Sequence, residues 1–276
     1  KLTSLAKRRG LIFQNSEIYG GLASTWDYGP IGAELKKNIK DYWWNYHVHM
    51  RDDIVALDSS ILSLNKVWET SGHVKNFSDP LLECKECNAR FRADILENTK
   101  GVCPTEKCSN SHFADPREFN MMFKTNIGPV VSDTSEIFLR PETAQGIFVN
   151  FENIINTSRK KIPFGVAQIG KAFRNEITTG NFIFRTREFE MMEIEYFVKP
   201  EDSEKYYKEW INGSMEFILS LNINKSNLRI REHSKEDLSH YSKGTSDIEY
   251  KFPWGWAELQ GIANRGSFDL DAHSKS

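Results

Sequence analysis

Apolar side chains recur at helical spacing in three stretches of the chain. The first follows Gly29-Pro30, where a proline suits the first turn of a helix, and runs over residues 31–46 with one broad apolar face. The second covers residues 144–159, and the third follows Pro200 and reaches Leu221. Each pattern predicts an amphipathic helix whose apolar side packs against a core.

Strand patterns occupy much of the remaining chain. Residues 164–176 and 184–198 are typical of the two arms of an antiparallel hairpin, because the turn between them is rich in Thr, Gly and Asn. Shorter strands are predicted at 53–57, 228–233 and 254–263. Strands that pair mainly as hairpins, with helices at irregular intervals, predict an α+β domain. We expect an antiparallel sheet flanked by helices rather than a doubly wound sheet.

Composition and charge narrow the class of protein. With 276 residues, of which 39% are hydrophobic and 12% aromatic, the chain can bury the core of one large domain or two small ones. Its 36 basic and 38 acidic residues give a net charge of −2, so any contact with nucleic acid must come from local patches. The N-terminal KLTSLAKRRG lacks an apolar segment, and no apolar run approaches the roughly 20 residues of a membrane span. We therefore expect a soluble, cytoplasmic protein.

Four cysteines lie close together in the sequence. Cys84 and Cys87 form a C-x2-C pair, and Cys103 and Cys108 form a C-x4-C pair. Clustered pairs suit a tetrahedral zinc site better than scattered disulfides. The second pair is wider than is usual, so two interpretations stay open. The four residues either bind Zn²⁺ or belong to a degenerate zinc ribbon whose thiols are free.

Charged and aromatic side chains gather on the predicted hairpin. Because side chains alternate across a strand, Arg174 and Glu176 share one face of the first arm. The second arm presents a similar set on one face: Arg185, Arg187, Phe189, Met191, Glu193 and Glu195. Buried charges need partners, so such a face is either solvated, with cross-strand ion pairs, or a surface that binds a charged ligand.

The hairpin carries a specific pair of motifs. FRNE at residues 173–176 and RTREF at 185–189 together resemble motif 2 of the class II aminoacyl-tRNA synthetases. The resemblance implies that Arg174 is the catalytic residue and binds the α-phosphate of ATP. It also implies an ATP site in which Glu176 contacts the adenine amino group, Arg185 reaches the γ-phosphate and Phe189 stacks on adenine. The implied ATP-binding residues of this region are Arg174, Asn175, Glu176, Phe184, Arg185 and Phe189.

Further stretches are similar to signatures of the glycyl-tRNA synthetases of the dimeric type. They are RPETAQGIF at 140–148, REFEMMEIEYF at 187–197, WGWAELQGIANRGSFDL at 254–270 and CKECNARFRAD at 84–94. The resemblance runs from about Leu11 to the end of the chain. It implies a class II catalytic fold over residues 1–276, with a small cysteine-containing insertion at 80–118.

The same resemblance implies a glycine site and a metal-assisted nucleotide site. Glu142 and Glu193 would hold the substrate ammonium, and Arg92 and Phe189 would contribute on the glycine side. The implied ligands of ATP and its Mg²⁺ on the WAELQG stretch are Glu258 and Leu259. An alternative role for Glu258 is an ion pair with Arg265. We assign structural roles to His233, His240 and Tyr241.

The activity implied by the resemblance is that of a glycine–tRNA ligase. Such an enzyme activates glycine with ATP to glycyl-adenylate and transfers glycine to the 3′ end of tRNA. The helix over 29–45 and the strand near Asp53 match the family's dimer-forming first motif, so we expect a homodimer. Two other functions stay open: that of a non-catalytic, synthetase-like binding subunit, and that of a class II synthetase for proline, threonine or histidine.

Two departures from the family pattern bear on completeness. The third class II motif and the anticodon-binding domain would lie beyond Ser276. The stretch between Asp94 and Phe119 is also short for the family. We therefore expect an incomplete catalytic domain, either as a piece of a longer protein or as a chain that lacks internal segments.

Overall fold

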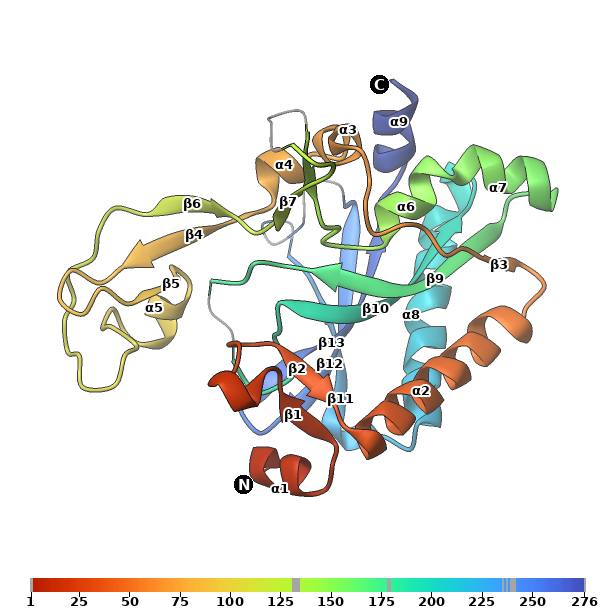
Figure 1. The fold of residues 1–276 in the computed structure, drawn as a ribbon. Helices are drawn as coiled ribbons and strands as arrows, with labels where there is room; N and C mark the ends of the chain where they lie inside the picture. The colour runs from red at the N-terminus through yellow and green to blue at the C-terminus, as the bar shows by residue number, and fades with distance from the viewer. Residues whose placement is uncertain are drawn as a thin grey trace. The chain divides into compact units, whose positions relative to one another are not determined.

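The chain divides into two compact units. A computed structural model describes residues 2–130, 135–177, 180–234, 236, 238 and 242–275. Unit 1 comprises Lys1–Trp43, Asp58–Gly146 and Gln168–Glu193, and unit 2 comprises Trp44–Leu57, Ile147–Ala167 and Ile194–Ser276. Helices and antiparallel strands occur together, as the α+β prediction requires (Figure 1). None of the helices within the described ranges is long and apolar enough to cross a membrane.

Unit 1 begins with a small hairpin packed on a long helix. Helix α1 (Leu2–Arg8) leads into strands β1 (Ile12–Gln14) and β2 (Trp26–Tyr28), with the 3-10 helix η1 (Glu17–Tyr19) between them. Helix α2 (Pro30–Trp44) starts at the predicted proline. A Cβ atom at Gly32 would lie 1.9 Å from the carbonyl oxygen of Leu11, so only glycine allows the hairpin to approach the start of α2 so closely.

The cysteine-containing insertion has its own sheet and core. Strands β4 (Ser78–Glu83), β5 (Arg90–Arg92) and β6 (Arg117–Asn120) pair in the order β5-β4-β6 and gather with helix α5 (Ile95–Asn98), drawn in yellow in Figure 1. Leu82 and Phe91 pack with Cys84 and Cys103 at the centre of this core. This sheet begins at Ser78 and ends at Asn120, about two residues beyond each end of the predicted insertion at 80–118.

Short elements complete unit 1. Helices α3 (Asn65–Thr70) and α4 (His73–Asn76) precede β4, and strands β7 (Lys124–Asn126) and β8 (Glu136–Phe138) pair antiparallel. Trp68, Met122 and Phe138 form a buried cluster against which Phe77 packs. The predicted helix 144–159 is two helices, α6 (Ala144–Val149) and α7 (Phe151–Ser158), because Asn150 leaves the helical region with φ −97° and ψ 3°.

Strands β9 (Phe164–Phe173) and β10 (Glu188–Phe197) form the predicted hairpin, and strand β3 (Ile54–Ala56) extends the sheet in the order β10-β9-β3. Strand β3 is parallel to β9, with Ile54 opposite Gly165 and Ala56 opposite Ala167. This pair adds one parallel neighbour to the predicted antiparallel sheet, and the α+β prediction itself is confirmed. A chain segment of about 110 residues separates the two strands, which leaves room for the crossover that parallel pairing needs.

Unit 2 contains a second antiparallel sheet next to the longest helix. The π-helix η2 (Asn45–His49) continues α2, and the 3-10 helix η4 (Pro200–Asp202) leads into α8 (Ser203–Ser220). After the 3-10 helix η5 (Lys225–Asn227), strands β11 (Leu228–Glu232), β12 (Gly244–Phe252) and β13 (Gly255–Asn264) pair in that order, followed by helix α9 (Phe268–Ser274). Hydrophobic periodicity missed β12, because the strand buries polar side chains: Ser246, Asp247 and Glu249.

Candidate active site

The tip of the β9–β10 hairpin is irregular. Strand β9 ends at Phe173 and β10 begins at Glu188, so the motif residues between them do not alternate across strand faces. The N–H of Arg174 still donates to the carbonyl of Arg187 across the arms at 2.9 Å, but other backbone groups of the tip bond to distant segments. The N–H of Asn175 donates to the carbonyl of Met121 at 2.7 Å, and the N–H of Arg187 donates to that of Ser24 at 3.1 Å. The prediction of strand up to 176 and from 184 was therefore wrong, although the motif residues are still held in place.

Arg174 is fixed by a carbonyl group and two aromatic rings. Its Nε donates to the carbonyl of Pro141 at 3.1 Å. The guanidinium carbon lies 5.3 Å from the ring centroid of Phe77 and 5.3 Å from that of Phe189. Rings at this distance attract a cation and restrict its rotation. The side chain thus presents a guanidinium, which suits phosphate oxygens, in one orientation.

Glu176 and Arg185 form an ion pair at the hairpin tip. Arg185 Nη1 lies 3.2 Å from Glu176 Oε2, and the Glu176 side chain is buried whereas that of Arg185 is 43% exposed. Arg187 braces the tip, because its guanidinium donates to the carbonyls of Ala23 and Glu176. One interpretation of the charged hairpin was a solvated face with cross-strand ion pairs, and this ion pair agrees with it for part of the site. Arg185 is nevertheless exposed enough to meet a ligand.

The remaining motif residues flank this pair. Asn175 is half-buried, and the Phe184 side chain is 36% exposed at the tip. Between the arms, Phe182 packs edge-on against Trp26 with their ring centroids 4.9 Å apart. The β1–β2 hairpin thus supports the tip through both Trp26 and the backbone of Ser24.

One short segment involves both predicted ammonium ligands. Glu142 belongs to it, and Glu193 contacts the next residue, Thr143. Thr143 donates its backbone N–H to Glu193 Oε2 at 2.9 Å and its hydroxyl to the same oxygen. The carboxylate of the preceding residue, Glu142, contacts His73 Nε2 at 3.2 Å and Gln145 Nε2 at 3.1 Å. Since Pro141 holds Arg174, the tripeptide 141–143 connects the predicted phosphate ligand with both predicted glycine ligands.

A buried arginine supports this tripeptide. Arg140 donates to the carbonyls of Lys171 and Ser59, both at 2.7 Å. Burial lowers the pKa of its guanidinium, and the charges of Asp58 and Glu193 oppose that shift. Arg140 therefore ties the segment before Glu142 to β9. Sequence patterns did not single out Arg140, Thr143 or His73, because their roles depend on neighbours that lie far away in the chain.

Arg92 lies in a group of charges near Glu176. Arg92 Nη1 lies 3.2 Å from Asp79 Oδ2, and its Nε and Nη2 each donate to Asp94 at 3.1 Å. Burial raises the pKa of Asp79; Arg92 opposes the shift, and the charge of Glu176 adds to it. These electrostatic partners connect Arg92 with the Glu176 end of the site. Its contact with glycine stays a prediction.

In unit 2, two carboxylates converge over a glycine. Glu258 is exposed on β13, and Asp247 is buried on β12. A Cβ atom at Gly261 would lie 3.1 Å from Glu258 Oε1 and 3.6 Å from Asp247 Oδ1, so the absent side chain leaves both carboxylates room. Paired carboxylate oxygens suit a hard cation such as Mg²⁺. The role of Glu258 at ATP and Mg²⁺ stays a prediction.

Residues near these two carboxylates form contacts within unit 2. Arg265 forms a bidentate pair with Asp269 at 2.7 and 2.9 Å, and an ion pair between Arg265 and Glu258 stays a prediction. His233 Nε2 lies 2.6 Å from Asp247 Oδ2, which agrees with a structural role. Leu259 is 43% exposed. The two other residues that were assigned structural roles, His240 and Tyr241, lie outside the described residues.

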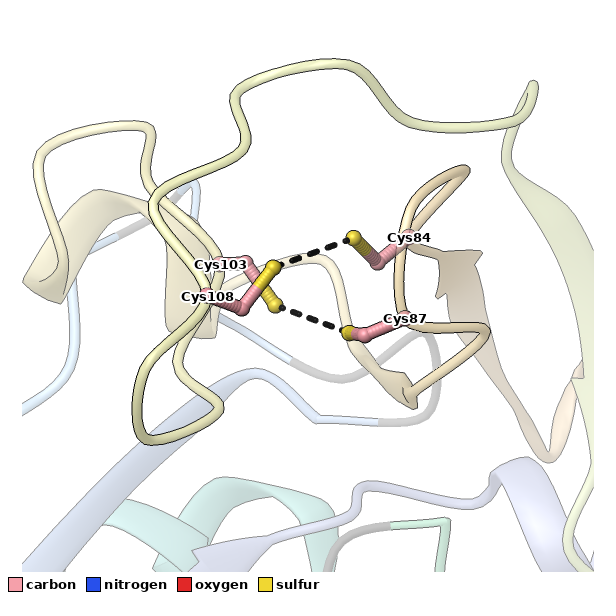
Figure 2. Close-up of side chains that lie close together, drawn as sticks. All are labelled: Cys84, Cys87, Cys103 and Cys108. Atoms are coloured by element: carbon pink, nitrogen blue, oxygen red, sulfur yellow. Dashed lines mark hydrogen bonds between the residues drawn. The ribbon is translucent and has the colours of Figure 1, made fainter.

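The four cysteines face one another in two pairs (Figure 2). Cys84 Sγ lies 3.8 Å from Cys108 Sγ, and Cys87 Sγ lies 3.7 Å from Cys103 Sγ, with all four sulfur atoms within 4.8 Å of one another. Disulfide sulfurs are only about 2.05 Å apart, whereas a tetrahedron with arms of about 2.3 Å has edges of about 3.8 Å. The residues therefore fit a tetrahedral zinc ion. A hydrogen bond from Asn110 lowers the pKa of Cys84 to about 6, whereas burial and the neighbouring thiols raise the pKa of Cys108.

Comparison with known proteins identifies the family. The family model described as "tRNA synthetase class II core domain (G, H, P, S and T)" matches residues 113–268, more than half of the chain. The chain therefore belongs to this family. A glycine–tRNA ligase of Alkaliphilus oremlandii is 52% identical over 301 residues, covering 100% of this chain and 65% of the relative. One from Borrelia garinii subsp. bavariensis is 54% identical over 275 residues, covering 99% of this chain and 61% of the relative. The chain thus spans somewhat less than two thirds of the length of these relatives.

Proposed function

We propose that this chain is the catalytic core of a glycine–tRNA ligase. The observation that carries the proposal is the tripeptide 141–143, which holds Arg174 on one side and presents or holds Glu142 and Glu193 on the other. A segment that carries one ammonium ligand, Glu142, and contacts a second ammonium ligand and a phosphate ligand suits the joining of ATP and an amino acid. Relatives more than 50% identical bear the name glycine–tRNA ligase, which supports the same activity.

ATP would bind at the hairpin tip. Arg174 would receive the α-phosphate, because its guanidinium is held between Phe77 and Phe189. When ATP binds, the exposed Arg185 would leave its ion pair with Glu176 and bind the γ-phosphate. The carboxylate of Glu176 would then accept a hydrogen bond from the adenine amino group. Phe189 would offer a ring to the base. Mg²⁺, when bound, neutralises phosphate charge, and the family resemblance assigns Glu258 and Leu259 to the binding of ATP and its metal.

Glycine would be selected because it has no side chain. Charge-assisted hydrogen bonds from its ammonium to Glu142 and Glu193 would orient it. A site that crowds the Cα atom rejects alanine by overpacking. The glycine carboxylate attacks the α-phosphorus of ATP and pyrophosphate leaves; Arg174 stabilises the developing charge, and no protein nucleophile is needed. The terminal ribose hydroxyl of tRNA then attacks the adenylate carbonyl carbon, and AMP leaves. This function implies a cytoplasmic location.

The cysteine cluster would bind a structural zinc ion. The sulfur geometry of Cys84, Cys87, Cys103 and Cys108 supports this role. The core around the cluster is small, and a core of that size needs a staple to stay folded. Zinc would therefore stabilise the insertion and take no part in the reaction.

The chain would form a homodimer through α2. Four apolar side chains at helical spacing are between 37% and 57% exposed on this helix: Ile31, Leu35, Ile39 and Tyr42. A continuous apolar stripe on a helix is typical of an interface, and a symmetric dimer covers it with its own copy. Trp43, on the same helix, is buried within the chain and does not belong to this stripe.

ATP–pyrophosphate exchange across amino acids tests the function. The full-length protein should exchange with glycine, and weakly or not at all with alanine, proline, threonine and histidine. Exchange with proline, threonine or histidine but not glycine would assign the chain to another class II synthetase. No exchange with any amino acid, from a folded protein, would favour the non-catalytic binding subunit.

A further inference from the structure

We infer that His73 is a positioning residue that sets the carboxylate of Glu142 for the glycine ammonium. The inference rests on the proposed function, and it adds a residue that sequence patterns did not single out. His73 begins helix α4, about 70 residues before Glu142 in the chain, yet their side chains meet.

The contacts at Glu142 come from two directions. His73 Nε2 lies 3.2 Å from Oε2, and Gln145 Nε2 lies 3.1 Å from Oε1. Because an ionised carboxylate has no proton to donate, the role inferred for His73 requires a ring that is protonated at Nε2. With a hydrogen bond from Gln145 on one oxygen and the close approach of Nε2 to the other, the carboxylate plane cannot rotate freely. Both side chains are largely buried, at 13% exposed for Glu142 and 10% for His73.

His73 is itself held rigidly. Its Nδ1 lies 2.8 Å from the hydroxyl oxygen of Ser71, a buried residue. Its ring packs edge-on against Trp68 and obliquely against Phe77, with centroids 5.5 Å apart in each case. Asn120 Nδ2 donates to its backbone carbonyl at 3.3 Å. Trp68 belongs to the buried cluster of unit 1, so the imidazole is anchored to the core.

This rigidity matters for binding an ammonium group. A carboxylate that can rotate loses entropy when it pairs with a cation, whereas one fixed in advance does not. Phe77 also contacts the Arg174 guanidinium, so His73 and Arg174 share a supporting ring. A histidine that only filled the core would need its ring and not its Nε2 proton. The two roles therefore differ in which atom of the side chain is required.

Two amide substitutions separate these roles. His73→Gln places an amide near the position of Nε2 and can still donate to Glu142, whereas His73→Asn reaches only the Nδ1 side. In glycine-dependent exchange by the full-length protein, His73→Asn should raise the glycine KM by about tenfold or more. His73→Gln should bring it back to within about threefold of the wild type. The ATP KM should change less than about twofold in both variants, because the inferred contact concerns only the glycine site.

Control variants keep the inference testable. Lys75→Ala, an exposed position on the same helix, should leave both KM values unchanged. If His73→Asn does not fold, Ser71→Ala replaces it, since only the hydroxyl that orients the ring is lost. That variant should raise the glycine KM severalfold. Equal glycine KM values for His73→Gln and His73→Asn, an unchanged value in Ser71→Ala, or a matching rise in the ATP KM would each overturn the inference. Absence of glycine exchange in the wild type would overturn the proposed function instead.

Discussion

Thr143 donates both its backbone N–H and its hydroxyl to one carboxylate oxygen of Glu193. Thr143 is fully buried, and Glu193 is half-buried on β10. Two donors on one oxygen fix the direction of the carboxylate. The predicted glycine site therefore depends on a threonine that need not touch the substrate.

Thr143→Val should weaken glycine binding without removing the backbone donor. Valine keeps the shape of the side chain and loses the hydroxyl, which bonds to a charged group. The loss is worth about 1.5–3 kcal/mol, or about tenfold to a hundredfold in the glycine KM. Thr143→Ser keeps the hydroxyl and should stay close to the wild type. Similar glycine KM values for the two variants, measured by exchange kinetics, would contradict the role of the hydroxyl.

Glu193→Gln and Glu176→Gln should have opposite kinetic effects. Glu193→Gln removes the charge opposite the ammonium, so the glycine KM should rise by about one to two orders of magnitude while the ATP KM changes little. Glu176→Gln should weaken ATP and spare glycine, because the predicted partner of Glu176 is the adenine amino group. Exchange kinetics with each substrate varied in turn measure both. A Glu193→Gln variant that lost ATP affinity instead would mean that the pocket is misassigned.

Arg174→Ala should abolish adenylate formation in a folded protein. The guanidinium acts on charge that develops in the transition state, and loss of such a group costs about 10²–10³ in kcat. Its contacts with Phe77 and Phe189 contribute only about 0.5–1 kcal/mol each to stability, so the fold should survive. Arg174→Lys keeps the charge but not the fork, and should also be strongly impaired. Normal exchange by a folded Arg174→Ala protein would refute the assignment.

Metal analysis tests the cysteine cluster. Protein purified without chelator should contain about one zinc ion per chain, since four thiolates complete a structural site. Cys87→Ser should lose the zinc, and amide hydrogen exchange should then accelerate within residues 78–120 more than elsewhere in unit 1. Ser109→Ala, an exposed neighbour, serves as the control. Well under one zinc ion per chain in the wild type would leave four free thiols as the better description.

Charge placed on the α2 stripe should break the dimer. Leu35→Glu puts a carboxylate in the middle of the stripe, where a partner copy would have to bury it. Sedimentation at micromolar concentration should then show a monomer, whereas the proposed dimer predicts that the wild type sediments at twice that mass. Ile18→Glu is the matched control, because Ile18 is 87% exposed and lies outside α2. A dimer that persists in Leu35→Glu would place the interface elsewhere.

Periodicity predicted helix α2 and the β9–β10 hairpin as elements, but it did not predict their burial. The first half of β9 is buried on both faces, and the apolar stripe of α2 is 37–57% exposed instead of packed in the core of the chain. Periodicity failed for β12, where the strand buries polar side chains and the apolar alternation disappears. It also failed at the hairpin tip, because the backbone partners of that loop, Met121 and Ser24, belong to distant segments.

The candidate site was predictable to the extent that motifs define it. Arg174, Glu142 and Glu193 stand in recognisable stretches, and their chemistry follows from charge. Thr143 and His73 could not be singled out in the same way. The role of each residue depends on a carboxylate that is distant in the sequence and close in space. No local sequence pattern indicates such a contact.

The parallel pairing of β3 with β9 also has a consequence for synthesis. Ile54 leaves the ribosome about 110 residues before its partner Gly165, a delay of roughly 5–20 s at ordinary elongation rates. Throughout that interval the backbone groups of β3 have no sheet to join, and a waiting strand edge can pair with another nascent chain. Pairing of such high contact order is slow even once both strands exist. Chaperone demand during translation should therefore concentrate on the interval between the emergence of β3 and that of β9.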